Sequence, residues 1–326
     1  MGAPILRAAL ACVLLSAGSG AAQPGATTAY PTKPLRVIVP YAPGGGGDLL
    51  TLMIGAKLTE AWGQPVVIDN RPGGGTIIGT ELVAKAPPDG YTILLCTNTH
   101  AVNASLYRKL PYDSIRDFAM VSLLATAPNI LVVNSALPAA TLGDFIALAR
   151  AKPRQLNYGS SGNGGTGHLA MEMLKSMTRI DLVHIPYKGG GPALNAVLAG
   201  EVSALFNNII ATVPQVKAGR LRALGVTSSR RSPAIPEVPA IAEAGVPGFE
   251  AISWFGFFAP AGTPPEVVDK LSKEVGRILR QPEIAERLSG QGADPVGSTP
   301  KEFTSFMQAD IGRWRKVVEF AHIQPD

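Results

Sequence analysis

The stretch LRVIVPYAPGGGGDLLTLMIGAKLTEAW, residues 35–62, decides the fold. Leu35–Val39 is a short, continuous apolar strand that ends at Pro40, and a glycine run then leads into a helix predicted at 48–62. A strand without polar alternation is typical of a parallel sheet that is covered on both faces and whose strands are joined through helices. The stretch therefore predicts the first unit of an α/β sheet.

The same alternation continues along the chain. Further strands are predicted at 66–69 and 91–96, with a helix at 76–85 between them. The pattern then restarts, with strands at 130–133, 156–158, 181–185, 202–206 and 222–227 and helices at 141–151, 168–177 and 192–199. Two more helices are predicted at 267–280 and 300–319. Two successive sets imply two α/β domains, each with a mainly parallel sheet.

Residues 1–22 have the layout of a cleavable secretory signal: one cation (Arg7), a short apolar stretch and a small-residue end. The apolar stretch is shorter than the roughly 20 residues that a membrane-spanning helix needs. Two alternatives are a buried N-terminal helix, for which no capping residue is present, and a lipoprotein modified at Cys12, which lacks the expected preceding leucine. We expect a mature periplasmic protein that begins at Gln23.

Charge and cysteine content exclude several classes of protein. The net charge is +5 and the basic residues are scattered, with Arg230 and Arg231 the only two adjacent arginines, so no basic surface for nucleic acid is indicated. A mild positive excess still suits attraction of anions. Once the signal is removed, Cys96 is the only cysteine, so no intramolecular disulfide is possible. At the end of an apolar run, Cys96 fits a packing role better than that of a nucleophile.

Three glycine-rich loops each follow a strand and precede a helix: 43–47, 72–75 and 159–167. In parallel sheets ligands bind where strands lead into helices, and the N-terminus of a helix offers free N–H groups to an anion. Asp48 is expected to cap the first of these helices and to use some of its N–H groups. The third loop, followed by a helix with no early acidic residue, is therefore the stronger predicted anion site. The second is expected to be only a tight turn.

Enzymatic alternatives have weaker support. Gly162, Gly164 and Gly167 satisfy the dinucleotide pattern G-x-G-x-x-G, but the next predicted strand ends in Pro-Tyr-Lys (186–188) rather than in the acidic residue that would hold a ribose. No metalloprotease or nucleophile-elbow motif occurs, and the four histidines lack metal-ligand spacing. His184, within an apolar strand, is expected to be a core residue.

Several segments together resemble the receptors of tripartite tricarboxylate transporters, the Bug family. They are YPTKP (30–34), VPYAPGG (39–45), NRPG (70–73), PDGYT (88–92), LPY (110–112), NYGSSGNG (157–164), HIPYKG (184–189) and FFAPAGTP (257–264). The resemblance implies a type II periplasmic binding protein fold with a ligand cleft between a first domain of residues 30–127 and 253–326 and a second of 128–252. It also implies a small carboxylate-bearing ligand (a di- or tricarboxylate, an amino acid or a related acid) and a permease of two integral membrane proteins.

Carried over position by position, the resemblance implies a set of ligand-binding residues on the loops and strand ends. They are Tyr41, Pro43, Gly44, Gly45, Asn98, His100, Ser160, Gly162, Asn163, Gly164, Thr166, His168, Tyr187 and Asn207. For Asn98 and His100 a solvated loop is the alternative. We expect a monomer that needs no cofactor or metal and has no catalytic residues. The alternatives are a receptor that presents its ligand to a periplasmic sensor and a small periplasmic enzyme.

The chain also departs from the family pattern. Members usually have Ser or Thr where this chain has Gly46 and Gly47, Arg where it has Leu52, and often Asp where it has Asn207. The glycines remove hydroxyl donors from the ligand loop. An Asp could pair with an ammonium group of the ligand, whereas the amide of Asn207 is neutral. The departures leave the identity of the ligand open.

Overall fold

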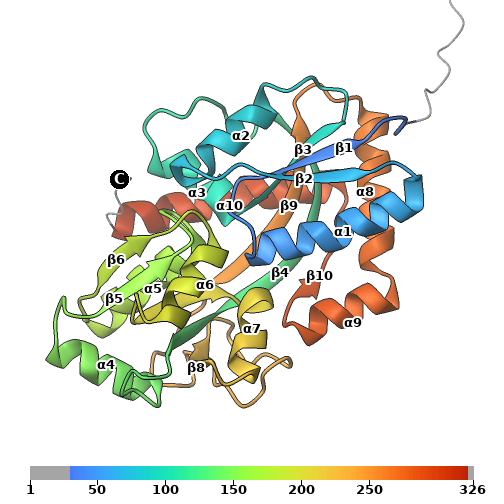
Figure 1. Cartoon of the computed structure of the whole chain (residues 1–326). Helices are drawn as coiled ribbons and strands as arrows, with labels where there is room; N and C mark the ends of the chain where they lie inside the picture. Colours follow the sequence, from blue (N-terminus) through green and yellow to red (C-terminus); the bar gives the residue numbers. More distant parts are fainter. Residues whose placement is uncertain (1–29, 322–326) are drawn as a thin grey trace, which may run out of the picture. The chain divides into compact units, whose positions relative to one another are not determined.

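The strands and helices of the first part of the chain, up to Thr97, are the predicted ones, to within two residues at each end. The computed structural model describes residues 30–321, and the predicted signal sequence lies outside them. Strands β1 (Leu35–Val39), β2 (Val66–Asn70) and β3 (Thr92–Thr97) pair in parallel in the order β2-β1-β3. Helix α1 (Gly46–Trp62) joins β1 to β2, and the short turn η1 (Gly74–Thr76) and α2 (Ile77–Ala84) join β2 to β3 (Figure 1).

A second parallel set follows in the second part of the chain. Strands β5, β6 and β7 pair in parallel in the order β6-β5-β7; helix α4 leads into β5, and helices α5 and α6 connect the three strands. The bounds are α4 Leu142–Ala151, β5 Asn157–Ser160, α5 Thr166–Thr178, β6 Val183–Pro186, α6 Gly190–Ala199 and β7 Ala204–Asn208. Helix α4 begins at the capping box of Thr141 and Asp144, which stabilises its first turn. The predicted elements of this set are confirmed to within about two residues of their ends.

Two long antiparallel strands cross the middle of the sheet. Strand β4 (Phe118–Asn134) pairs with β9 (Ile252–Pro260) as far as Pro128, and from Asn129 onward it pairs with β7 and β8 (Leu221–Val226). The strand predicted at 130–133 is thus only the end of a 17-residue strand. One ten-stranded sheet of order β2-β1-β3-β9-β4-β7-β5-β6 results, with β8 and β10 (Asp294–Pro295) also paired to β4.

Among residues 30–321, two hydrophobic clusters lie along this sheet. One includes Leu94, Phe258 and Phe303, and the other includes Leu131, Tyr158 and Phe206. Residues from Pro31 onward nevertheless form one compact unit, so the division into 30–127 with 253–326 and 128–252 remains a prediction. No helix in residues 30–321 is long and apolar enough to cross a membrane.

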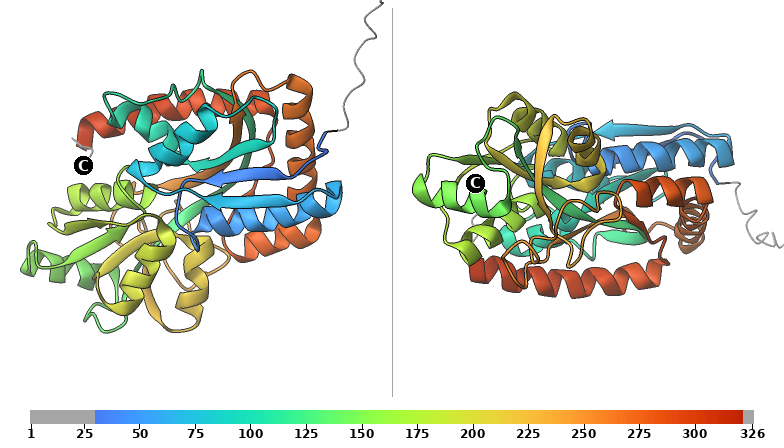
Figure 2. Two further views of the ribbon diagram at one scale, coloured as in Figure 1. Left: turned by 45° about the horizontal axis from the view of Figure 1, so that its top comes forward. Right: turned by 90° about the horizontal axis from the view of Figure 1, so that it is seen from below.

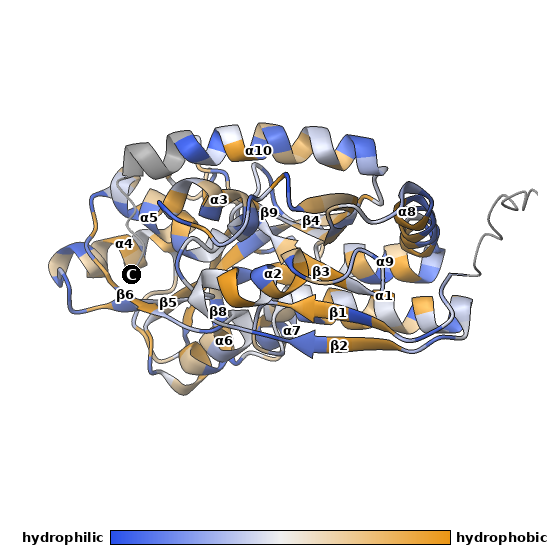
Figure 3. Cartoon of the chain, turned by 90° about the horizontal axis from the view of Figure 1, so that it is seen from above, coloured by the Kyte–Doolittle hydropathy of each residue, from blue (hydrophilic) through white to orange (hydrophobic). Residues whose placement is uncertain are grey.

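The remaining helices cover the sheet. They are α3 (Asn98–Leu106), α7 (Ile209–Lys217), α8 (Pro265–Leu279), α9 (Pro282–Gly290) and α10 (Pro300–Ala321). Helix α10 packs against α3 and β4. It is the long red helix in the two views of Figure 2. Hydropathy follows this layering, because β1 and β3 are mainly apolar whereas the long surface helix α10 carries many polar residues (Figure 3). Residues 98–100, for which a solvated loop was the alternative, are instead the first turn of α3.

Candidate functional site

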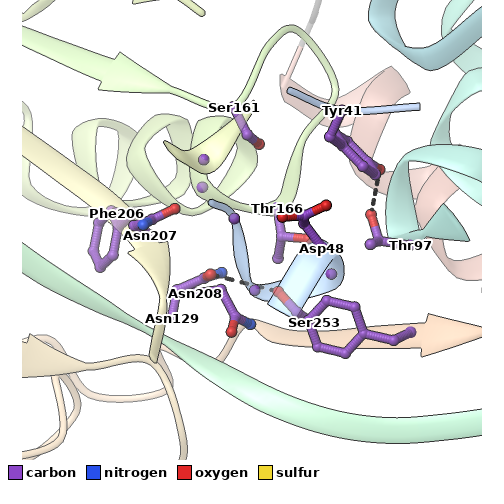
Figure 4. Close-up of a pocket in the computed structure, with 16 residues that line it drawn as sticks. Tyr41, Asp48, Thr97, Asn129, Ser161, Thr166, Phe206, Asn207, Asn208 and Ser253 are labelled. Carbon is purple, nitrogen blue, oxygen red and sulfur yellow. Dashed lines mark hydrogen bonds between the residues drawn. The ribbon is translucent and has the colours of Figure 1, made fainter. Parts of the chain in front are cut away.

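An inner cavity of about 60 Å³ lies where the strands of both parallel sets lead into helices. By volume it holds about four water molecules or one small polar group. Its lining residues come from the ends of β3 and β7, from the starts of α1, α5 and α6, and from β4 and β9 (Figure 4). They are Tyr41, Gly45, Gly46, Gly47, Asp48, Thr97, Asn129, Ser161, Thr166, Gly167, Gly190, Phe206, Asn207, Asn208, Ser253 and Phe255.

Three helix N-termini border this cavity without a side-chain cap. Helices α1, α5 and α6 begin after Gly45, Gly165 and Gly189, none of which has a side chain that could accept a hydrogen bond. The first N–H groups of a helix have no acceptor within the helix, and the helix dipole adds partial positive charge there. Helices α5 and α6 also lack an acidic residue in their first turn. The cavity is therefore suited to an anion.

Asp48 is the one charged side chain among these lining residues. It is buried, and its Oδ2 accepts from the backbone N of Gly44 at 2.9 Å while its Oδ1 accepts from Asn70 Nδ2, also at 2.9 Å. The prediction that Asp48 caps α1 is wrong, because this carboxylate binds the N–H of Gly44, which precedes the helix, and not an N–H of the first turn. The N-cap position itself belongs to Gly45.

The first loop touches the start of α6 backbone to backbone. The N–H of Ala42 donates to the carbonyl oxygen of Lys188 at 2.8 Å. A Cβ added to Gly191 would collide with the carbonyl oxygen of Pro43, and one added to Gly190 would lie 2.6 Å from Asn207 Oδ1. Only glycine allows this approach. The predicted residues Pro43 and Gly44 take part in this contact but do not line the cavity.

The third glycine loop is held in shape by its own side chains. Ser160 Oγ accepts from the N–H of Gly162 at 3.1 Å, and His168 Nδ1 accepts from the N–H of Gly164 at 3.2 Å. The φ angles of these glycines, 119° and 70°, are ones that other residues rarely adopt. Two backbone donors that were expected to meet the ligand are therefore already occupied. Ser161, which was not predicted, and Thr166 line the inner cavity instead.

His168 supports the third glycine loop without lining either this cavity or the adjoining one. Its ring stacks on that of His184 with centroids 4.1 Å apart, and His184 in turn stacks on Tyr158. Burial lowers the pKa of His168 to about 4. The imidazole is therefore neutral near pH 7, which leaves Nδ1 free to accept from Gly164. The hydroxyl of Tyr158 donates to the carboxylate of Glu172 at 2.5 Å.

An outer cavity of about 320 Å³ adjoins the inner one, because Tyr41 and Ser161 line both. Of the predicted site residues, Gly162, Asn163 and Tyr187 also line it. The remaining lining residues are Pro40, Gly73, Gly74, Gly75, Thr76, Ile77, Tyr107, Pro186 and Lys188. The second glycine loop, expected to be only a turn, thus forms a wall of this cavity.

Asn98 and His100 line neither cavity. Asn98 Oδ1 accepts from the N–H of Trp254 at 2.9 Å, which ties α3 to β9. His100 is buried among Tyr112, Phe118 and Phe258. Its Nε2 donates to Ser114 O at 2.9 Å, and burial lowers its pKa to about 4. The structure corrects the expected placement of both residues, because the chain enters α3 directly after β3 and buries them.

Besides Ser161, four further polar lining residues were missed: Thr97, Asn129, Asn208 and Ser253. Thr97 Oγ1 is 2.7 Å from the hydroxyl of Tyr41 and so orients a predicted residue. Asn208 follows Asn207 at the end of an apolar strand, and this position was a signal from which Asn208 could also have been predicted to line the site. Asn129 and Ser253 lie on the crossing strands, whose extent the sequence pattern did not reveal. In residues 30–321 no group of three or more His, Cys, Asp and Glu side chains is placed to hold a metal ion.

Comparison with solved structures identifies the class of protein. Rpa4515 of R. palustris, solved with adipate, superimposes with a TM-score of 0.88 and 41% identity over 91% of this chain and 100% of that one. MatC from Rhodopseudomonas palustris, solved with malate, superimposes with a TM-score of 0.84 and 34% identity over 89% and 100%. The fold is the α/β fold of the periplasmic binding proteins, as predicted.

Sequence comparison then gives the family. The model of the tripartite tricarboxylate transporter family receptor matches residues 52–322. Protein BugT of Bordetella pertussis is 38% identical over 93% of this chain and 93% of its own length. The chain belongs to the tripartite tricarboxylate transporter receptor family, whose members are solute-binding receptors and not enzymes. The resemblance that the sequence motifs suggested is confirmed.

Proposed function

We propose that this protein captures a small carboxylate in the inner cavity and catalyses no reaction. Three uncapped helix N-termini around a cavity without a basic lining residue carry this proposal. Such a site holds an anion by N–H donors and helix dipoles rather than by an ion pair. The ligands of two related structures, adipate and malate, are both dicarboxylates, which supports the same chemistry here.

The rest of the ligand would extend into the outer cavity. The inner cavity has room for one carboxylate group and few further atoms, whereas the outer cavity is about five times larger. Tyr41 and Ser161 would then flank the middle of the ligand. This arrangement favours linear acids with a carboxylate at one end.

Capture would involve closure of two domains, residues 30–127 with 253–326 and residues 128–252. The change in pairing of β4 at Pro128 and Asn129 supports a hinge there. The hydrogen bond from Ala42 to Lys188 would form on closure. In the cell, the mature monomer would begin at Gln23, lie in the periplasm and deliver its ligand to a permease of two integral membrane proteins.

Titration calorimetry and thermal unfolding with adipate, malate, citrate and aspartate test the proposal, with NADH as the control for the dinucleotide alternative. A carboxylate at 100 times its Kd should stabilise the protein by about 2.7 kcal/mol. Stabilisation by at least one acid and none by NADH is expected. Stabilisation by NADH with no response to any acid would contradict the proposal.

A further inference from the structure

Two amide groups of the inner cavity have no partner for their nitrogen. Asn129 Nδ2 and Asn208 Nδ2 are both buried and have no hydrogen-bond partner among the described residues. Both residues line the inner cavity, and Asn129 is only 3% exposed. A buried donor without an acceptor costs about 1–3 kcal/mol. Such donors at a cavity indicate a ligand group that accepts from them.

The orientation of both amides follows from their oxygens. Asn208 Oδ1 accepts from the N–H of Ile210 at 3.1 Å and so caps α7. Asn129 Oδ1 is 3.5 Å from Ser253 Oγ, which donates to it. Each amide thus has its oxygen engaged within the protein, which leaves its nitrogen as the group that a ligand can meet.

The two amides lie next to each other. Asn129 and Asn208 are directly opposite in the antiparallel pairing of β4 with β7, a position in which side chains share one face of the sheet. Figure 4 draws them close together beside Ser253. The two side-chain nitrogens are donors only, so they favour an oxygen that accepts over an ammonium group.

Asn208 also contacts the first turn of α1. A Cβ added to Gly46 would collide with Asn208 Oδ1. The side chain of Asn208 therefore fills the space that any side chain at position 46 would need. This places the amide beside the uncapped N-terminus of α1, so that one anion can contact both.

We propose that Asn129 and Asn208 form a paired-amide subsite that donates hydrogen bonds to a carboxylate oxygen of the bound acid. This inference rests on the proposed function and names two further residues that carry it. Because Asn129 lies where β4 passes from β9 to β7, the same contact would join the ligand to the strand that both parallel sets share.

Two variants remove the donors while keeping the structural role of each side chain. Asn129→Asp has the same shape and keeps an oxygen for Ser253, and Asn208→Ser keeps an acceptor that caps α7. Asn157→Asp is the matched control, since it adds the same charge at an asparagine whose Oδ1 accepts from Ser203 outside either cavity. Affinity for the tightest-binding acid among adipate, malate, citrate and aspartate is measured by calorimetry, and folding by thermal unfolding.

We expect affinity to fall at least about tenfold in Asn129→Asp and about fivefold to tenfold in Asn208→Ser, with a change below about twofold in Asn157→Asp. If Asn129→Asp does not fold, the side-chain NH₂ signals of ¹⁵N-asparagine-labelled wild-type protein, assigned through Asn208→Ser and Asn129→Ser, give the same information on adding the acid. Both signals are expected to shift.

Two results overturn the inference in distinguishable ways. Folded Asn129→Asp and Asn208→Ser proteins that bind the acid within about twofold of wild type, or unchanged NH₂ signals at saturation, would remove the subsite and leave the proposed function intact. A wild-type protein that binds none of the four acids would overturn the proposed function, and this inference with it.

Discussion

The two glycine loops on either side of the inner cavity use their glycines for different purposes. In the first loop Gly45 lies against Gly190, so that backbone meets backbone where both line the inner cavity. In the third loop Gly162 and Gly164 allow unusual φ angles, and side chains then fix the loop. The comparison shows that the free donors belong to the helix N-termini and not to the glycines of the third loop.

The largest effect is expected where the first loop meets α6. Gly191→Ala would place a methyl group against the carbonyl oxygen of Pro43 and prevent this contact. We expect calorimetry to detect no binding, while the unfolding temperature stays within a few degrees because alanine favours a helix. Gly143→Ala is the matched control, in the first turn of α4 with only ordinary contacts. Wild-type affinity in Gly191→Ala would show that the close approach is not needed.

Acid should act on the third loop through His168. Burial lowers the pKa values of His168 and His100 from about 6.5 to about 4, so between these pH values the unfolded chain binds more protons than the folded one. Stability is therefore complete above about pH 6.5 and falls as the pH drops to about 4, by roughly 3 kcal/mol for each histidine. Protonation of Nδ1 would also release the N–H of Gly164.

Variants of the two histidines distinguish the effect of acid on stability from its effect on ligand affinity. Thermal unfolding and calorimetry from pH 7 to pH 4 on His168→Gln and His100→Leu provide the test. We expect each variant to lose part of the acid sensitivity of folding, and only His168→Gln to lose acid sensitivity of ligand affinity. An equal effect of both variants on the pH dependence of affinity would contradict the role of His168 as the support of the loop.

Gly164→Val should weaken binding through the shape of the third loop. The φ angle of 70° is unfavourable for valine, and its Cβ would lie 3.0 Å from Leu106 and 3.2 Å from Val102. We expect affinity to fall about thirtyfold, corresponding to strain of about 2 kcal/mol. Gly219→Val has the same φ of 70° in open space and controls for strain alone. Equal affinities of the two variants would remove the third loop from the site.

The smallest effect is expected at Asn207, near the end of β7. Its Nδ2 donates to Thr212 Oγ1 at 3.1 Å, and its Oδ1 faces the start of α6. Asn207→Asp would place a negative charge in an anion site. It would therefore weaken the binding of acids without an amino group by about 1 kcal/mol. Calorimetry with malate and aspartate on both proteins tests this, and an unchanged ratio of the two affinities would contradict it.

Local sequence signals predicted the parallel strands and their loops, because an apolar run followed by glycine marks both the strand end and the helix start. The two antiparallel strands that cross the middle of the sheet, β4 and β9, were harder to predict. Strand β4 continues through Ser122, Thr126 and Pro128, and β9 has no separating pattern of its own, so neither was delimited. Helix α3 was missed because its first turn, Asn-Thr-His, is polar in sequence yet buried in the structure.

The same limit applies to the site. Tyr41, Gly45, Thr166 and Asn207, predicted to bind the ligand, line the inner cavity, since each lies on a loop, at a strand end or at a helix start. Their contact with a ligand stays a prediction. Asn129 could not be found in this way, because its position depends on the register of β4 against β7. Whether a loop N–H is free or already bonded, as at Gly164, likewise depends on a side chain that only the folded chain brings near.

A crystal structure of the protein with the tightest-binding acid of the panel tests the central claim most directly. We predict one carboxylate in the inner cavity, with its oxygens within about 3.2 Å of first-turn N–H groups of α1, α5 or α6. An acid bound with both ends in the outer cavity, or in the groove between α3 and α10 that Tyr107 and Arg315 line, would contradict capture by the helix N-termini.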